Sequence, residues 1–200
     1  TDYRYKNIVK ERYFMDIRNK KMVLISHCLC NTNSKVSGFS PRPACEQDLL
    51  NVIFENGYGI IQLPCPENRV YGNRRWGQSR EQFDNPHFRS QCRKMLIPLI
   101  QEVEDYLKNG YRIAAVISVY GSPSCGYSGS FSNSSYGGEL CIDTVQLQLD
   151  SSRLEPSPGV FMNEFSNLMK EHDLAIPFVD FMEEDPAGSI EKILSLIGNK

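Results

Sequence analysis

The sequence predicts a single α/β domain with a mostly parallel sheet covered by helices on both faces. Short apolar runs alternate along the chain with segments whose apolar residues recur at helical spacing. The run "RIAAVISV" at 112–119 is apolar at almost every position, as expected of a strand buried on both faces. At 200 residues the chain is long enough for one domain with a sizeable core.

The first half of the chain predicts two strands and two helices. The apolar stretches 22–27 and 58–64 are typical of strands, and a helix between them begins near Pro43 and ends at Gly57. Its inward face would be formed by Cys45, Leu49, Val52, Ile53 and Asn56. A polar stretch with the only tryptophan follows, and Asn85-Pro86 then begins a second helix that ends at Gly110. Pro98 is expected to kink or divide that helix.

The second half continues the same alternation. The strand at 112–119 should be central, and the strand at 174–180 should lie at an edge because Pro177 cannot donate a ladder hydrogen bond. Helices are expected after Ser157-Pro158 and after Asp185-Pro186. We therefore predict a Rossmann-like domain at 22–200 that follows a charged N-terminal extension at 1–21.

The composition excludes several function classes. A net charge of −2 provides no field to hold a phosphate backbone, so non-specific nucleic-acid binding is not expected. No apolar run has membrane-spanning length, and residues 1–21 lack the apolar centre of a signal peptide. A cytoplasmic location is therefore expected.

The seven cysteines are the most informative residues in the sequence. Their odd number does not suggest a disulfide framework, and a reducing compartment would keep them as thiols. Three of them, Cys28, Cys65 and Cys125, follow a predicted strand. Because ligands bind where parallel strands end, we expect these three thiols to meet in space. Small buried side chains are the better interpretation of Cys45, Cys92 and Cys141, whereas Cys30 fits that interpretation and a supporting role equally well.

Three converging thiols are compatible with more than one kind of centre. They could hold an iron–sulfur cluster, or a zinc ion with water as its fourth ligand, and either arrangement leaves one open position for a substrate. Zinc would be expected to recruit histidine, but strand alternation points His27 away from Cys28, and the other two histidines fall on helices. A hydrolase with Cys125 as nucleophile would lack a histidine base at the strand ends.

Three motifs resemble one known family. "SHCLC" at 26–30, "PCPE" at 64–67 and "GSPSCG" at 121–126 occur in this order, each after a predicted strand, and "GVFMNEF" at 159–165 resembles a later helix start. Together they resemble the 2-thiouracil desulfurase family over about residues 22–180.

The resemblance implies a specific chemistry. Such proteins carry a [4Fe-4S] cluster on three cysteines, here Cys28, Cys65 and Cys125. The open iron binds the sulfur of a small thiolated compound such as a thiouracil-like base. Water then converts C=S to C=O, and hydrogen sulfide leaves without net redox change.

The motifs also imply roles for other residues. Glu67 is the expected proton relay, with a carboxyl pKa raised by partial desolvation, and Ser122 would assist it. Glycine at 121 and 126 would let the backbone approach the cluster. Substrate contacts are expected from Ser26, Asn31, Ser124 and Gly126.

Simpler interpretations stay open beside these roles. Glu67 could instead cap a helix or pair with an arginine, and the serines could make ordinary turn hydrogen bonds. The segments after Cys28 and after Glu67 depart from the family's pattern, so the cluster site carries over better than the substrate. Arg74, Arg75 and Trp76 could clamp an anionic or planar ligand, or lie in solvent. The same three cysteines could also serve a non-catalytic iron–sulfur or sulfur carrier or sensor.

Overall fold

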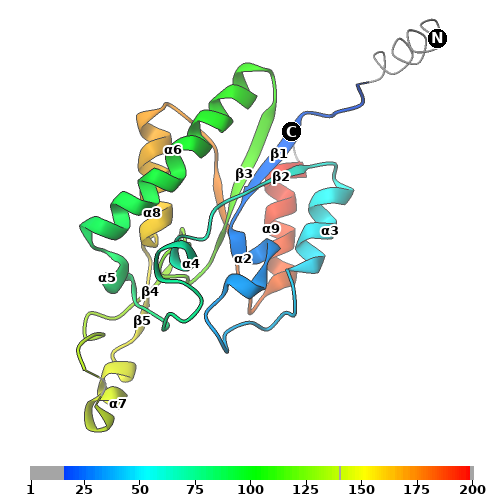
Figure 1. Cartoon of the computed structure of the whole chain (residues 1–200). Coiled ribbons are helices and arrows are strands. Elements are labelled where there is room, and N and C mark those ends of the chain that lie inside the picture. The colour runs from blue at the N-terminus through cyan, green and yellow to red at the C-terminus, as the bar shows by residue number, and fades with distance from the viewer. Residues whose placement is uncertain (1–15, 140, 199–200) are drawn as a thin grey trace, which may run out of the picture.

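A four-stranded parallel sheet forms the centre of the computed structural model, which describes residues 16–139 and 141–198 (Figure 1). Its strand order is β2-β1-β3-β6, and every neighbouring pair is parallel. The strands are β1 (Lys21–Ile25), β2 (Gly59–Gln62), β3 (Arg112–Val119) and β6 (Phe178–Phe181). The predicted α/β class is confirmed, β3 has the predicted bounds and a central position, and β6 lies at an edge as Pro177 indicated.

Helices cover both faces of this sheet (Figure 1). On one face, α6 (Pro86–Lys108) and α8 (Val160–Glu171) pack on Leu24, Ile113 and Val116. On the other face, α3 (Gln47–Glu55) and α9 (Pro186–Gly198) enclose a second core. That core includes Val23, Ile25, Leu49, Ile53, Ile117, Ile193 and Ile197. Burial of both strand faces explains why the central strands are continuously apolar.

Some local predictions were wrong. Of the two effects expected of Pro98, division does not occur, because α6 continues through Pro98, which is exposed. Cys45 lies before α3, which begins at Gln47, so Cys45 is not on its inward face. His27 and Cys28 both belong to a short helix, α2 (His27–Cys30). Strand alternation therefore does not set their relative directions.

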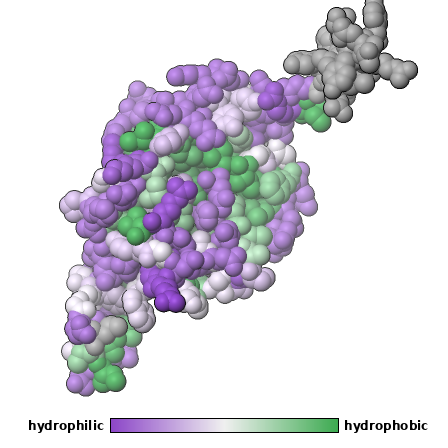
Figure 2. Space-filling model, in the orientation of Figure 1, coloured by the Kyte–Doolittle hydropathy of each residue, from purple (hydrophilic) through white to green (hydrophobic). Residues whose placement is uncertain are grey.

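Short elements surround the carboxyl ends of the strands. A 3-10 turn, η1 (Thr32–Ser34), follows α2, and α4 (Pro66–Tyr71) and α5 (Arg80–Phe83) follow β2. An arm made of β4 (Ser130–Ser132), α7 (Ile142–Asp150) and β5 (Arg153–Glu155) projects beyond the sheet, at the lower left of Figure 1. Apolar side chains gather at the α7 tip in Figure 2, where Ile142 and Leu147 are exposed. This antiparallel arm was not predicted from the sequence.

Within the described part of the chain, no helix combines the length and apolar character needed to cross a membrane. Of the predicted extension at 1–21, residues 1–15 lie outside the described residues, and β1 begins at Lys21.

Candidate functional site

The structure brings Cys28, Cys65 and Cys125 together beyond the ends of β1, β2 and β3. Burial raises the pKa of the Cys28 thiol to about 12, an effect that nearby Lys35 opposes and Cys65 reinforces. Burial raises the pKa of Cys125 well above its ordinary value, and both Cys28 and Cys65 add to that increase. Since each of these effects acts through space, the three thiols share one environment.

The Cys125 loop is folded tightly on itself. The Cys125 N–H donates to Ser122 Oγ at 3.0 Å, and the Gly126 N–H donates to the Ser122 carbonyl at 3.0 Å. An added Cβ at Gly126 would lie 2.1 Å from the carbonyl oxygen of Gly129. Glycine is therefore required at 126 for close backbone packing. The Gly126 N–H is already used within the loop, which gives this residue a structural role there.

The first turn of α8 anchors the same loop. Its N–H groups at Phe161 and Met162 donate to the Ser124 carbonyl at 3.0 and 3.2 Å. At Gly159, which precedes the helix, a Cβ would lie 2.6 Å from the Ser124 carbonyl carbon. Only glycine lets the start of α8 approach so closely. The segment "GVFMNEF" is thus coupled to the cysteine loop by backbone contacts.

Cys65 occupies the N-cap of α4. Its Sγ accepts a hydrogen bond from the Asn68 N–H at 3.4 Å, and Pro66 takes the first helical position, where no N–H is needed. Burial raises the pKa of Cys65, while the Asn68 N–H and the Arg75 guanidinium oppose the increase. Both opposing groups would stabilise a thiolate at this position.

Glu67 lies one residue into α4 and faces the Cys125 loop. Its Oε1 accepts a 2.5 Å hydrogen bond from Ser124 Oγ, which itself lies 3.3 Å from Cys125 Sγ. Its Oε2 accepts from Arg75 Nε at 3.0 Å. The Arg75 side chain is only 3% exposed and also donates to the carbonyls of Ser34 and Gly72 at 2.7 and 3.2 Å. Of the interpretations of Glu67, the arginine partner is therefore present in the structure.

One ion pair near Cys28 was not predicted from the sequence. Lys35 Nζ lies 2.5 Å from Glu183 Oε2, and both side chains are largely buried. Each of them affects the pKa of Cys28, Lys35 by lowering it and Glu183 by raising it. Glu183 follows β6, so the argument that selected the cysteines at strand ends could also have found Glu183. No sequence pattern points to Lys35.

Asp180 on β6 was also missed. Its Oδ1 accepts from Ser118 Oγ at 2.7 Å and from the Tyr127 N–H at 2.9 Å. Its Oδ2 accepts from the Ser128 N–H at 2.7 Å and from Ser128 Oγ at 2.5 Å. A carboxylate with four donors fixes the chain just after Cys125 to the neighbouring strand.

Two predicted substrate contacts lie in the segment after β1. Ser26 is 1% exposed, and its Oγ has no hydrogen-bond partner among the described residues. Asn31 instead caps η1, because its side-chain oxygen accepts from the Asn33 N–H at 3.2 Å. Ser26 thus has an unused polar group beside Cys28, whereas Asn31 has a local structural role.

The remaining cysteines lie in three different settings. Burial raises the pKa of Cys30 to about 11, and Cys45 adds to that increase. The two thiols therefore lie within electrostatic range of each other. Cys92 is buried in the core, as predicted. Cys45 is only partly buried, and Cys141, the N-cap of α7, is exposed, so the predicted burial of these two was wrong. Cys141 is exposed because α7 buries none of its residues.

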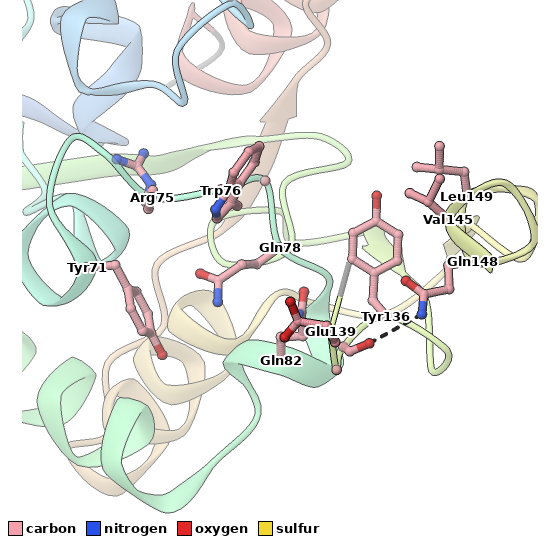
Figure 3. A pocket seen from close by; sticks show the side chains of 13 residues that line it. Tyr71, Arg75, Trp76, Gln78, Gln82, Tyr136, Glu139, Val145, Gln148 and Leu149 are labelled. Atoms are coloured by element: carbon pink, nitrogen blue, oxygen red, sulfur yellow. Dashed lines mark hydrogen bonds between the residues drawn. The ribbon is translucent and has the colours of Figure 1, made fainter. Parts of the chain in front are cut away.

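A cavity of about 750 Å³ has Arg75 in its lining (Figure 3). It lies between the segment that follows α4 and the α7 arm. Arg75 and Trp76 both line it. Arg74 is exposed and does not line this cavity. Arg75 therefore contacts both the cavity and the carboxylate beside the thiols.

One known protein is clearly similar to this chain. The uncharacterized protein MJ0003 of Methanocaldococcus jannaschii is 33% identical over 109 residues, which cover 54% of this chain and 69% of the archaeal protein. The chain belongs to the same family as MJ0003. No protein-family model matches the chain. No solved structure matches it.

The donor set indicates what the site could hold. Within residues 16–139 and 141–198, no group of three or more histidine, cysteine, aspartate or glutamate side chains is placed to hold a metal ion. A single zinc ion, with Zn–S bonds of about 2.3 Å, would require its thiolates in mutual contact. In an iron–sulfur cluster each thiolate binds a different iron, so more widely spaced thiols suffice. One buried thiol and two partly buried thiols within electrostatic range of one another are compatible with such a cluster.

Proposed function

We propose that this protein is an iron–sulfur-dependent desulfurase acting on a small thiolated compound, such as a thiouracil-like base. The reaction is a hydrolysis in which R₂C=S and H₂O give R₂C=O and H₂S, so no oxidant or reductant is consumed. The observation that carries the proposal is the set of three neighbouring thiols, one buried and two partly buried, with Glu67 and Ser124 hydrogen-bonded beside Cys125.

Cys28, Cys65 and Cys125 are the residues that would hold a [4Fe-4S] cluster. When bound, such a cluster supplies a Lewis acid at its open iron position, which polarises a carbon–sulfur double bond. The protein must release the thiol protons first, because only thiolates bind metal. The Asn68 N–H at Cys65 and the Lys35 ammonium near Cys28 are placed to stabilise those thiolates.

Glu67 and Ser124 form a two-step proton path. The Ser124 hydroxyl already donates to Glu67 Oε1 at 2.5 Å, and its oxygen can accept a proton from an attacking water. The serine proton then passes to Glu67, which returns it to the departing sulfur. The second water proton, lost from the C–OH group as C=O forms, reaches the sulfur by the same path, so that sulfur leaves as H₂S. Arg75 supports this path by holding the other oxygen of Glu67 in place. Ser122 Oγ, 3.4 Å from Ser124 Oγ, orients the serine.

Sulfide release by anaerobically purified protein tests this function. We expect one sulfide per product from 2-thiouracil, 4-thiouracil or a related thioamide. Glu67→Gln should keep its iron and lose at least about 100-fold in rate, the usual contribution of a positioned acid–base group. The matched control is Glu102→Gln, at an exposed position on α6. A cluster-containing protein that releases no sulfide from any of these compounds would support a carrier or sensor, and a cluster-free Glu67→Gln variant would undo the assignment of Glu67.

A further inference from the structure

The cavity beside Arg75 has three aromatic rings on its walls. Tyr71 and Trp76 come from the segment around α4, and Tyr136 comes from the arm (Figure 3). The Tyr71 ring is held in place by Phe83 and Phe88, each with its centroid 5.7 Å away. Trp76 is 78% exposed, so its large ring faces solvent at the cavity. Aromatic rings in such positions can bury their faces against a flat ligand, and this burial stabilises the bound state.

Carboxamides supply most of the uncharged polar groups in the cavity. They belong to Gln78, Gln82 and Gln148. Gln78 Oε1 is buried and has no hydrogen-bond partner among the described residues. In Figure 3 the Gln78 amide extends across the opening toward Tyr71. A buried acceptor without a donor is unfavourable, so a ligand with an N–H or O–H group would satisfy it.

The charges in the cavity do not favour an anion. Arg75 is the only basic residue among the described lining residues, and its guanidinium is already bonded to Glu67 and to the carbonyls of Ser34 and Gly72. Glu139, also in the lining, adds a negative charge. A phosphate or carboxylate would therefore find no cation free to pair with it.

We propose that this cavity binds an uncharged, planar heteroaromatic compound with a hydrogen-bond donor on its ring, up to the size of a nucleoside. Its volume of about 750 Å³ lies in the range of small-molecule sites. The proposal does not depend on desulfurase chemistry. It concerns a cavity whose lining includes Arg75 but not Glu67, and occupancy there can be measured without turnover.

Trp76 provides the measurement, because it is the only tryptophan in the chain. Uridine is titrated into the purified full-length protein while tryptophan emission is recorded, and its 5′-monophosphate is titrated in parallel. We expect a saturable change with uridine and at least tenfold weaker binding of the monophosphate. Gln78→Leu should weaken uridine binding about tenfold. Gln101→Leu, at an exposed glutamine on α6, is the matched control and should bind as the wild type does.

Three results would overturn the proposal: no saturable emission change with uridine, equal binding by Gln78→Leu, or tighter binding of the monophosphate. Thermal unfolding of each variant establishes that it is folded, and Tyr136→Phe, which keeps the ring, should retain binding. Because the readout is fluorescence, its failure would leave the desulfurase proposal standing. Failure of sulfide release would equally leave this one standing.

Discussion

Arg75 and Glu67 form an ion pair that connects the lining of the aromatic cavity to the thiol site. Arg75 Nε lies 3.0 Å from Glu67 Oε2, and their side chains are 3% and 13% exposed. The other carboxylate oxygen bonds to Ser124, the residue before Cys125. A short series of hydrogen bonds thus joins the cavity wall to the third thiol.

Removing the arginine of this ion pair should lower the stability of the folded protein. Arg75→Met leaves the Glu67 carboxylate largely buried without its counter-ion, and we expect a loss of about 3 kcal/mol in the free energy of unfolding. Arg74→Met, at the exposed neighbour, should change stability by less than about 0.5 kcal/mol. Urea unfolding of the metal-free protein measures both. Equal stability of the two variants would show that the buried pair does not stabilise the fold.

The glycine before α8 is a second test of the site's architecture. Gly159→Ala would place a Cβ 2.6 Å from the Ser124 backbone, so the helix start or the Cys125 loop must shift. We expect about 1 to 3 kcal/mol of destabilisation, as for other overpacked positions, with loss of metal binding. Gly77→Ala has open space around its Cβ and is the control. Wild-type stability in Gly159→Ala would mean that the loop and helix are not in such close contact.

The attachment of the arm should be sensitive to acid. Burial opposes ionisation of Glu81, but hydrogen bonds from Ser132 Oγ at 2.5 Å and the Asn133 N–H at 2.8 Å outweigh it and lower the pKa of Glu81 to about 2. Because the folded-state pKa lies below the ordinary value of 4.5, this stabilisation is present above pH 4.5 and is lost as pH falls toward 2.

Glu81→Gln should therefore lose about 1 to 2 kcal/mol of stability at pH 7, a figure reduced for the partial exposure of the group. The deficit should become small near pH 2, where about half of the wild-type carboxyl is also protonated. Unfolding curves of both proteins from pH 7 to 2 measure this difference. A deficit that stays constant over the whole range would show that the ionised carboxylate is not its source.

Much of the fold follows from local sequence. The apolar run at β3 sets its bounds, and β6 lies at the predicted edge, although Pro177 precedes the first residue of that strand. Pro98 does not divide α6, since an exposed position in a long helix packed through its other face tolerates a proline. The α7 arm was missed because a nine-residue helix without buried residues leaves no inward apolar pattern to recognise.

Only the part of the site that lies at the strand ends could be predicted from the sequence. Parallel strands end along one edge, and that rule alone brings the three thiols near one another. Contacts between loops could not be derived in this way. Lys35 and Glu183 are 148 positions apart, and the Arg75 side chain reaches Glu67 only because the chain turns after α4. Such pairs depend on tertiary packing, which periodicity does not encode.

The metal content of cysteine variants tests the central claim most directly. Protein purified without oxygen is analysed for iron, acid-labile sulfide and zinc, in the wild type and in single serine variants. We predict about four iron and four sulfide per chain in the wild type, as a [4Fe-4S] cluster requires. We expect loss of the cluster in Cys28→Ser, Cys65→Ser and Cys125→Ser, and retention in Cys92→Ser and Cys141→Ser. A colourless wild-type protein with one zinc per chain, or equal iron in all five variants, would contradict the account.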